Sequence, residues 1–249
     1  MSEAIKDLLY RIADDELVIG HRNSEWTGLG PILEEDIAFS SIAQDQIGHA
    51  LANYGLLNEH FGEAIPDVIA FSRNEKEFHS SQFVELPIGD YAFSLMRHFL
   101  FDHAESIRYN LLALSSFAPL ASLARKIKGE LKYHTLHADL WIKKLGTGTE
   151  ESHARMQAAL NEAWPYALGL FEPGNFENEL IEFKIFSGEE TLRDAWLAAV
   201  TPILEKAGLV IPKNAKPKFG GRKGYHTEYL QSLLDEMTEV YRLDPAATW

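Results

Sequence analysis

Cysteine is absent from the 249 residues of this sequence. Its absence excludes a disulfide framework, a thiolate nucleophile, and zinc or iron–sulfur sites with cysteine ligands. Histidine, aspartate and glutamate are then the strong metal ligands that the chain offers. Because a chain without disulfides suits a reducing compartment, we expect a cytoplasmic location.

Basic residues are few compared with acidic ones: 23 Lys and Arg stand against 37 Asp and Glu, for a formal net charge of −14. Such a surface repels nucleic acids and anionic membranes, so we expect neither as a partner. Long apolar runs are also lacking, since no stretch reaches the roughly 18 uncharged residues of a membrane-spanning helix. The first residues carry charge and contain no apolar leader, so we expect no cleaved signal.

Apolar residues recur at helical spacing along most of the chain, and clusters of Gly, Pro, Asn and Ser separate the periodic runs. The pattern predicts an all-α fold. Long helices are expected at about 3–20, 31–60, 89–115, 119–146, 150–170, 189–207 and 227–241, with a long irregular connection at 72–82. Short connections favour antiparallel neighbours in one bundle. We therefore expect a single domain, 1–249, with a four-helix core at about 3–145 and accessory helices at about 150–242.

Each of the first four predicted helices places polar side chains in the middle of its apolar stripe. In chain order they are Glu16; Gln46 and His49; Asp102 and Glu105; and Glu130 and His134. Burial of an unpaired carboxylate is costly. These side chains therefore predict a shared polar centre, as in helical bundles that hold two metal ions.

A di-iron carboxylate site takes one glutamate from each of two helices and a Glu-x-x-His pair from each of the other two. The sequence supplies this set incompletely. The second helix offers Gln46-x-x-His49, with an amide where a carboxylate is needed, and the fourth offers Leu131-x-x-His134. Glu130 and His134 have the looser i,i+4 spacing. Two of the chelating carboxylates are thus weakened or lost, and no metal is expected at these positions.

Three interpretations of this centre remain open. The first is a network of buried hydrogen bonds that fixes helix register, with Glu16 bound to Gln46 or Glu105 bound to His134. The second is a divergent di-iron centre, and the third is one metal ion held by the remaining ligands.

Several short strings, taken in their order along the chain, are more specific than the periodicity. They are Ser24-Glu25-Trp26, Gly30-Pro31-x-Leu33-Glu34-Glu35-Asp36-Ile37-Ala38, Glu130-x-x-Tyr133-His134-x-x-His137-Ala138, Gly148-Thr149-Glu150-Glu151-Ser152-His153, Gly220-Gly221-Arg222-x-Gly224-x-His226-Thr227-Glu228 and Pro245-x-x-x-Trp249. Through this ordered set, essentially the whole chain resembles the C subunits of multicomponent phenylacetyl-CoA epoxidases, which act in aerobic phenylacetate degradation.

The resemblance implies a ferritin-like bundle with a structural, non-catalytic role. In that family the partner is a catalytic A subunit, whose di-iron centre epoxidises the ring of phenylacetyl-CoA with oxygen and with electrons from NADPH through a reductase. The resemblance thus implies no cofactor on this chain, and it implies the A, further complex and reductase subunits as partners. The residues Gln46 and Leu131 agree with that role. The alternative is that the chain is itself a divergent di-iron or single-metal oxygenase.

Contact with the coenzyme A thioester would need cationic or N–H donors, because coenzyme A is polyanionic. Two polar interruptions are candidates for this contact with coenzyme A. They are Lys76, Glu77, Phe78 and His79 in the long connection, and Glu177, Asn178 and Glu179 after the break at Gly174. Aromatic residues near helix ends are candidates for a subunit interface, and they include Trp26, Phe71, Phe78, Phe83, Tyr91, Phe93, Phe171, Phe176, Phe183 and Phe186.

Overall fold

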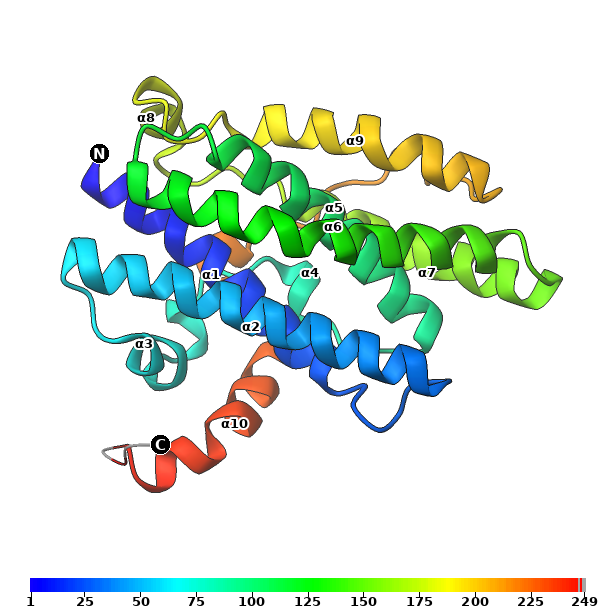
Figure 1. Cartoon of the computed structure of the whole chain (residues 1–249), viewed down its shortest axis with the longest axis horizontal. Coiled ribbons are helices and arrows are strands. Elements are labelled where there is room, and N and C mark those ends of the chain that lie inside the picture. The colour runs from blue at the N-terminus through cyan, green and yellow to red at the C-terminus, as the bar shows by residue number, and fades with distance from the viewer. Residues whose placement is uncertain (246, 248–249) are drawn as a thin grey trace.

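The computed structural model describes residues 1–245 and 247, and all regular structure in these residues is helical (Figure 1). The long helices are α1 (Ser2–Ser24), α2 (Leu33–Phe61), α5 (Tyr91–Leu112), α6 (Ala118–Gly146), α7 (Glu150–Gly169), α9 (Glu189–Lys206) and α10 (Glu228–Leu243). Each matches a predicted helix, so the predicted all-α class is confirmed. Trp249, which ends one of the quoted strings, lies outside the described residues.

Helix α1 continues four residues past Gly20, where the sequence predicted its end. Gly20 is buried inside the helix and faces α2. A Cβ atom at this position would lie 2.9 Å from Cγ1 of Ile47. Glycine therefore serves here as the contact point between two closely packed helices, not as a helix terminator.

The connection between α2 and α5 is more ordered than predicted. It contains α3 (Pro66–Ser72), a 3₁₀ turn η1 (Glu75–Glu77) and α4 (Gln82–Glu85). Asn74 caps η1 in a reciprocal capping box with Glu77. Two further short elements follow later in the chain: α8 (Glu177–Glu182) and η2 (Gly221–Lys223).

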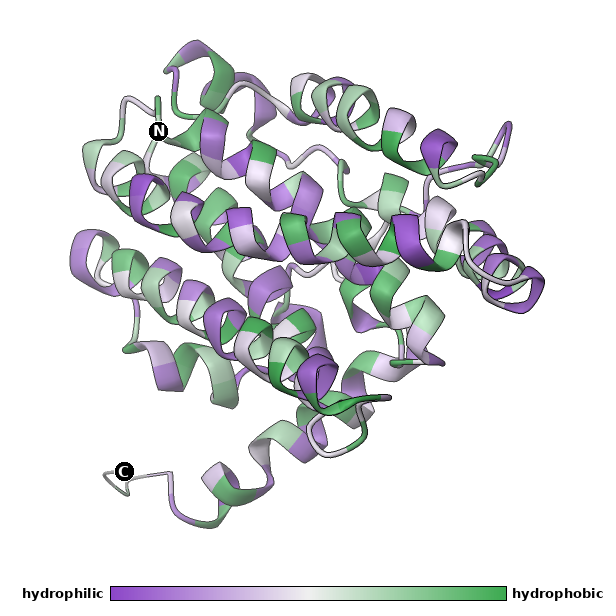
Figure 2. Cartoon of the chain, turned by 45° about the vertical axis from the view of Figure 1, so that its right-hand side comes forward, coloured by the Kyte–Doolittle hydropathy of each residue, from purple (hydrophilic) through white to green (hydrophobic). Residues whose placement is uncertain are grey.

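The four helices α1, α2, α5 and α6 form a ferritin-like bundle, in which α1 packs along α2 and α5 packs along α6 (Figure 1). Helices α7 and α9 pack against α5 and α6, whereas α10 extends along the lower edge and contacts α3. Hydrophobic and hydrophilic residues alternate along the long helices, as their periodicity predicted (Figure 2). Among the described residues, no helix has both the length and the apolarity needed to cross a bilayer.

Half of the aromatic residues predicted to form an interface are buried in the core instead. Buried members of that set are Phe78, Phe83, Phe93, Phe171 and Phe186. Phe183, next to α8, is exposed. Large rings near helix ends close the ends of the bundle, since they bury more apolar area there than any other side chain could.

Candidate functional site: a polar centre inside the bundle

The structure brings most of the predicted mid-helix residues together. Glu16, Gln46, Asp102 and His134 are fully buried at the centre of the bundle, one from each helix of the core. His49 is also buried, one turn after Gln46. Sequence periodicity was therefore sufficient to predict that a polar centre exists and which helices build it.

His49 lies between two carboxylates. Its Nε2 is 2.7 Å from Glu130 Oε2, and its Nδ1 is 3.4 Å from Glu16 Oε1. Burial opposes a charge on the ring, but the two carboxylates outweigh burial and raise the pKa of His49 to about 9. Burial also raises the pKa of Glu16, and His49 opposes that effect. Glu130 itself reaches the surface, where half of its side chain is exposed.

His134 makes a second such contact. Its Nε2 is 3.0 Å from Asp45 Oδ2, while its Nδ1 is 3.6 Å from Asp102 Oδ1, which is an electrostatic contact longer than a hydrogen bond. Despite burial, these carboxylates raise the pKa of His134 to about 10. Asp102 also contacts His98 directly. Although burial opposes its charge, the neighbouring imidazoles hold the pKa of Asp102 well below its usual range.

The side-chain amide of Gln46 in α2 links α1 to α5. A carboxylate at this position could not make both of its hydrogen bonds. Its oxygen accepts a hydrogen bond of 2.9 Å from Asn23 Nδ2, and its nitrogen donates to Asp102 Oδ1 at 3.4 Å. A carboxylate can accept but not donate, so glutamate here would place a second negative charge beside Asp102. The amide therefore suits a hydrogen-bonded network better than a metal site.

Glu105 is buried, but it points to a different partner from the one predicted. Its Oε1 accepts a hydrogen bond of 2.8 Å from Arg108, which also donates to Glu189 of α9 at 2.9 Å. Burial raises the pKa of Glu105 to about 8, against the opposing charge of Arg108. The two pairings suggested by the sequence, Glu16 with Gln46 and Glu105 with His134, are therefore wrong. The network is present, but its partners differ.

The sequence analysis missed several residues of the network, among them Glu35, His98 and His137. His98 Nε2 lies 3.2 Å from His137 Nδ1, and His137 Nε2 lies 2.9 Å from Glu35 Oε2. Burial, with the charge of His98, lowers the pKa of His137, and Glu35 opposes this. The signal was in the spacing, because His98 and Asp102 are four residues apart on one face, and His134 and His137 are three apart.

Three side chains of the network donate hydrogen bonds to the Glu35 carboxylate. It accepts hydrogen bonds from Tyr91 Oη at 2.5 Å, His137 Nε2 at 2.9 Å and Trp141 Nε1 at 2.7 Å. Glu35 lies in the first turn of α2, where the sequence suggested only the usual enrichment of acidic residues. In the fold it links the start of α2 to α5 and α6.

The donors at this centre do not fit a di-iron site. Gln46 offers an amide and Leu131 an alkyl side chain at the positions where a Glu-x-x-His pair would need carboxylates. The carboxylates beside both ring nitrogens of His49 favour a protonated imidazole, which has no lone pair for a metal. Across the residues that the structure describes, no group of three or more His, Asp or Glu side chains has the arrangement needed to hold a metal ion.

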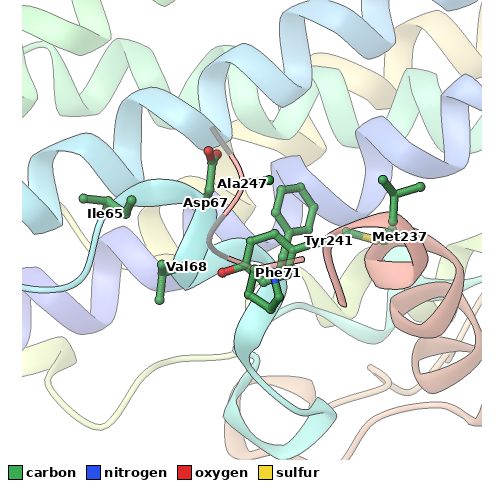
Figure 3. A pocket seen from close by; sticks show the side chains of 9 residues that line it. Ile65, Asp67, Val68, Phe71, Met237, Tyr241 and Ala247 are labelled. Atoms are coloured by element: carbon green, nitrogen blue, oxygen red, sulfur yellow. The ribbon is translucent and has the colours of Figure 1, made fainter. Parts of the chain in front are cut away.

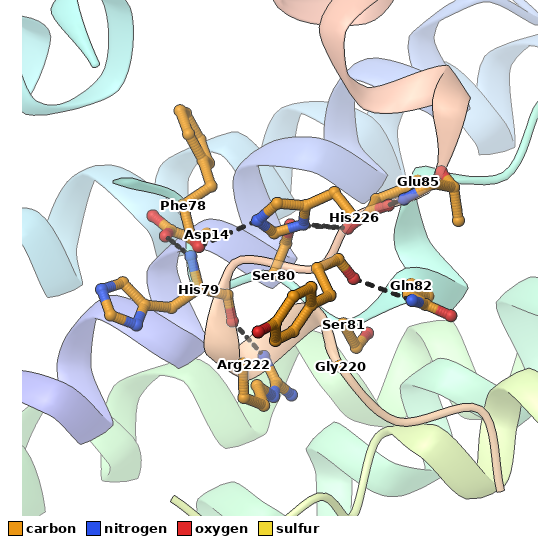
Figure 4. A network of polar contacts seen from close by, with 12 residues as sticks. Asp14, Phe78, His79, Ser80, Ser81, Gln82, Glu85, Gly220, Arg222 and His226 are labelled. Carbon is orange, nitrogen blue, oxygen red and sulfur yellow. Dashed lines mark hydrogen bonds and ion pairs between the residues drawn. The ribbon is translucent and has the colours of Figure 1, made fainter. Parts of the chain in front are cut away.

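The first segment predicted to contact coenzyme A is packed against α1 (Figure 4). Phe78 is buried beneath Arg73, whose guanidinium carbon lies 4.1 Å from the ring centre. Asp14 accepts from Arg73 Nη2 at 2.6 Å and from the backbone N–H of His79 at 2.7 Å. Lys76 remains at the surface as an exposed cation of this segment.

The second segment forms the first turn of α8 and is acidic. Glu177 accepts from the backbone N–H of Glu189 at 2.5 Å, and Glu179 accepts from the N-terminal amine of Met1 at 3.0 Å. Carboxylates repel the phosphates of coenzyme A. On electrostatic grounds, the first segment with Lys76 is the better candidate, and contact of either segment with coenzyme A stays a prediction.

A groove of about 360 Å³ lies between α3 and α10 (Figure 3). Its walls include Ile65, Val68 and Phe71 from one side and Met237 and Tyr241 from the other. The side chains are mainly apolar, and Asp67 is an acidic group at the rim. Such a lining has no group suited to binding phosphates.

Taken together, the fold and this centre define a ferritin-like helical bundle whose middle is filled by paired imidazoles and carboxylates. The chain belongs to the phenylacetic acid catabolic protein family, which matches residues 1–249. The C subunit of the 1,2-phenylacetyl-CoA epoxidase of Escherichia coli (strain K12) is 34% identical to it over 239 residues, covering 96% of each chain. The A subunit of the 1,2-phenylacetyl-CoA epoxidase of the same strain is 26% identical over 206 residues, covering 80% of this chain and 66% of that relative.

Proposed function

We propose that this chain is a structural, non-catalytic subunit of a phenylacetyl-CoA epoxidase that acts in phenylacetate breakdown. It binds the catalytic A-type subunit, which carries the di-iron centre, and keeps that subunit folded and soluble. Further subunits and a reductase complete the complex. The identity of 34% with the C subunit of such an epoxidase, over nearly the whole chain, supports this choice of complex. The weaker similarity to the A subunit supports a pairing of two related bundles.

The observation that carries the structural role is that the polar groups at the bundle centre are already paired with one another. His49 holds two carboxylates, Asp102 lies between two imidazoles, and Glu105 is bound to Arg108. A metal ion would have to displace a proton or a cation from each of these groups. The pairing supports a role in fixing four helices against one another.

Co-expression tests this role. The A-type subunit from the same organism is produced alone and together with this chain, and its soluble yield, iron content and epoxidation of phenylacetyl-CoA are measured. We expect a large loss of soluble A-type subunit, tenfold or more, when this chain is omitted. An A-type subunit that is equally soluble and active alone would contradict the proposal.

The second candidate is an oxygenase centre on this chain itself, and the convergence of Glu16, His49, Asp102 and His134 favours it. Iron content separates the two candidates without a substrate assay. The isolated chain is treated with ferrous iron under anaerobic conditions, desalted and analysed for metal. We expect iron near zero, whereas about two iron ions per chain would make the oxygenase the better candidate.

A further inference from the structure

The outer side of α2 is unusually poor in charge. The helix contains no lysine or arginine, and between Asp36 and Glu59 its only carboxylate is Asp45. Leu33, Ile37 and Leu51 point outward from this helix, and each exposes more than half of its surface. In a chain with a net charge of −14, a helix face of this length with so little charge needs an explanation.

The neighbouring helix α6 continues the same kind of surface. Tyr133, Leu136 and Leu140 lie at helical spacing on its outer side and are 50 to 60% exposed. We call these three residues, together with Leu33, Ile37 and Leu51, the α2/α6 face. Figure 1 looks onto α2 and α6, and no other helix lies in front of them. Lys132 and Lys143, also exposed on α6, place charge beside these apolar residues, as in many protein interfaces.

The outer surface of α2 and α6, of which the α2/α6 face is the apolar part, is comparable in size with one side of a stable protein interface. Helices α2 and α6 each have 29 residues, so each is about 43 Å long. Side by side they offer on the order of 800 Å², which is about what one partner contributes to a stable complex. Gly48 and Gly129 are exposed, and a Cβ atom at either would meet nothing within 4 Å, so a partner helix can approach both backbones closely.

Two carboxylates within this surface, Asp45 and Glu130, are already compensated from inside. Asp45 lies 3.0 Å from the buried ring of His134, and Glu130 lies 2.7 Å from the buried ring of His49. Covering an unpaired carboxylate with another protein is costly, but covering a paired one costs much less. The polar centre thus makes this surface suitable for burial, which links an internal feature of the bundle to its exterior.

We propose that the α2/α6 face is the docking surface for the A-type subunit, which covers it with an uncharged helical surface of its own. This rests on the proposed function. A second copy of this chain is the alternative occupant, and it would appear as a homodimer that a substitution in this face dissociates. An anionic membrane is unsuitable, because the chain has a net charge of −14.

Substitution of single exposed residues tests the docking surface. The chain is tagged and co-expressed with the A-type subunit from the same organism, as wild type and as Ile37→Glu and Leu136→Glu. Each change places an unpaired carboxylate in the interface, so we expect at least a tenfold drop in the A-type subunit captured per tagged chain. Leu243→Glu on α10 is the matched control, because it makes the same change at an exposed residue away from this face.

The outcomes separate this inference from the proposed function. Capture by the wild type and by Leu243→Glu, with loss in both face variants, supports the docking surface. If the wild type captures no A-type subunit, the proposed function fails and the docking surface fails with it. If Ile37→Glu and Leu136→Glu capture as much as the wild type, the docking surface is wrong while the proposed function stands. A wild-type homodimer that Leu136→Glu converts to a monomer would identify a second copy as the occupant instead.

Discussion

Two buried polar clusters hold this bundle together, and they neutralise charge in different ways. The centre between α1, α2, α5 and α6 pairs carboxylates with histidines. The second cluster, which we call the arginine clamp, ties the segment between α3 and α4, together with η2, to α1 (Figure 4). It consists of Asp14, Asp15, Arg73 and Arg222 with the backbone groups that they bind.

The arginine clamp joins segments that are far apart in the sequence. Arg222 donates to Asp15 Oδ2 at 2.6 Å and to the carbonyl of His79 at 2.8 Å, and Asp15 also accepts from the backbone N–H of Ser81. Glu85 extends the cluster by accepting from His226 and from the backbone of Thr227. Both oxygens of Asp15 and of Glu85 are therefore occupied by donors.

The two clusters differ in the pH range over which their cations stay protonated. Arginine stays protonated at any pH that a folded protein survives, so the arginine clamp keeps its charges. Histidine can lose its proton, so the centre keeps its charges only up to the pKa values of its rings. Irregular segments are thus fixed by permanent charges, whereas the regular helices, which apolar packing already holds, carry the titratable network.

The largest expected effect of a single substitution at neutral pH is on the stability that the arginine clamp provides. Asp14 is fully buried and binds Arg73, Tyr54 and the backbone of His79. Asp14→Asn removes the charge that compensates the Arg73 guanidinium, so the free energy of unfolding should fall by about 3–5 kcal/mol. Urea unfolding followed by circular dichroism measures the change.

Asp194→Asn is the control for this substitution. Asp194 also pairs with an arginine, Arg193, but both side chains are exposed. A surface pair contributes about 0–1 kcal/mol, so the control should remain close to the wild type. If both substitutions lowered the free energy of unfolding equally, the contribution of the Asp14–Arg73 pair to stability would not depend on its burial.

The second expected effect is a dependence on alkaline pH that comes from the centre. The pKa values of His49 and His134 are raised to about 9 and about 10, whereas histidines of the unfolded chain lose their protons near 6.5. The folded chain therefore holds extra protons in this range. Their stabilising contribution is complete below about pH 6.5 and is lost as the pH rises through 9 to 10.

Unfolding in urea between pH 6.5 and 10 measures this loss. Each of the two histidines should contribute a slope of about 1.4 kcal/mol per pH unit up to its pKa, and Glu105, with a pKa of about 8, should steepen the lower part. His134→Gln should remove one such slope, whatever its effect on stability at neutral pH. The exposed His60→Gln serves as the control. An unchanged slope in His134→Gln would mean that this ring is uncharged in the fold.

The sequence was sufficient for the helices and for the existence of the centre, because both follow from periodicity. It was insufficient for the partners within the centre. Asp102 and Glu105 are three residues apart on one helix, yet Asp102 meets histidines while Glu105 meets Arg108, which also binds Glu189. Which residue faces which partner depends on the rotation of α5 and on the position of α9, and no local pattern contains either.

The arginine clamp could not be predicted from the sequence for a related reason. Asp15 and Arg222 are 207 residues apart, and no sequence motif predicts that they pair. The exposed α2/α6 face was also not predicted. The interface candidates from the sequence were aromatic residues near helix ends. The apolar residues that remain exposed on α2 and α6 are mostly aliphatic, and they occur in the middle of helices.

The smallest expected effect concerns the rim of the centre. Tyr91→Phe removes one of the three donors to Glu35 and leaves His137 and Trp141 in place. Because a hydrogen bond to a charged group contributes about 1.5 kcal/mol, the free energy of unfolding should fall by about that amount. Tyr225→Phe, at an exposed tyrosine, should change it by less than about 0.5 kcal/mol. If both variants match the wild type, two donors are enough for Glu35. The hydrogen bonds of Glu35 to His137 and Trp141 of α6 are then sufficient to hold the start of α2.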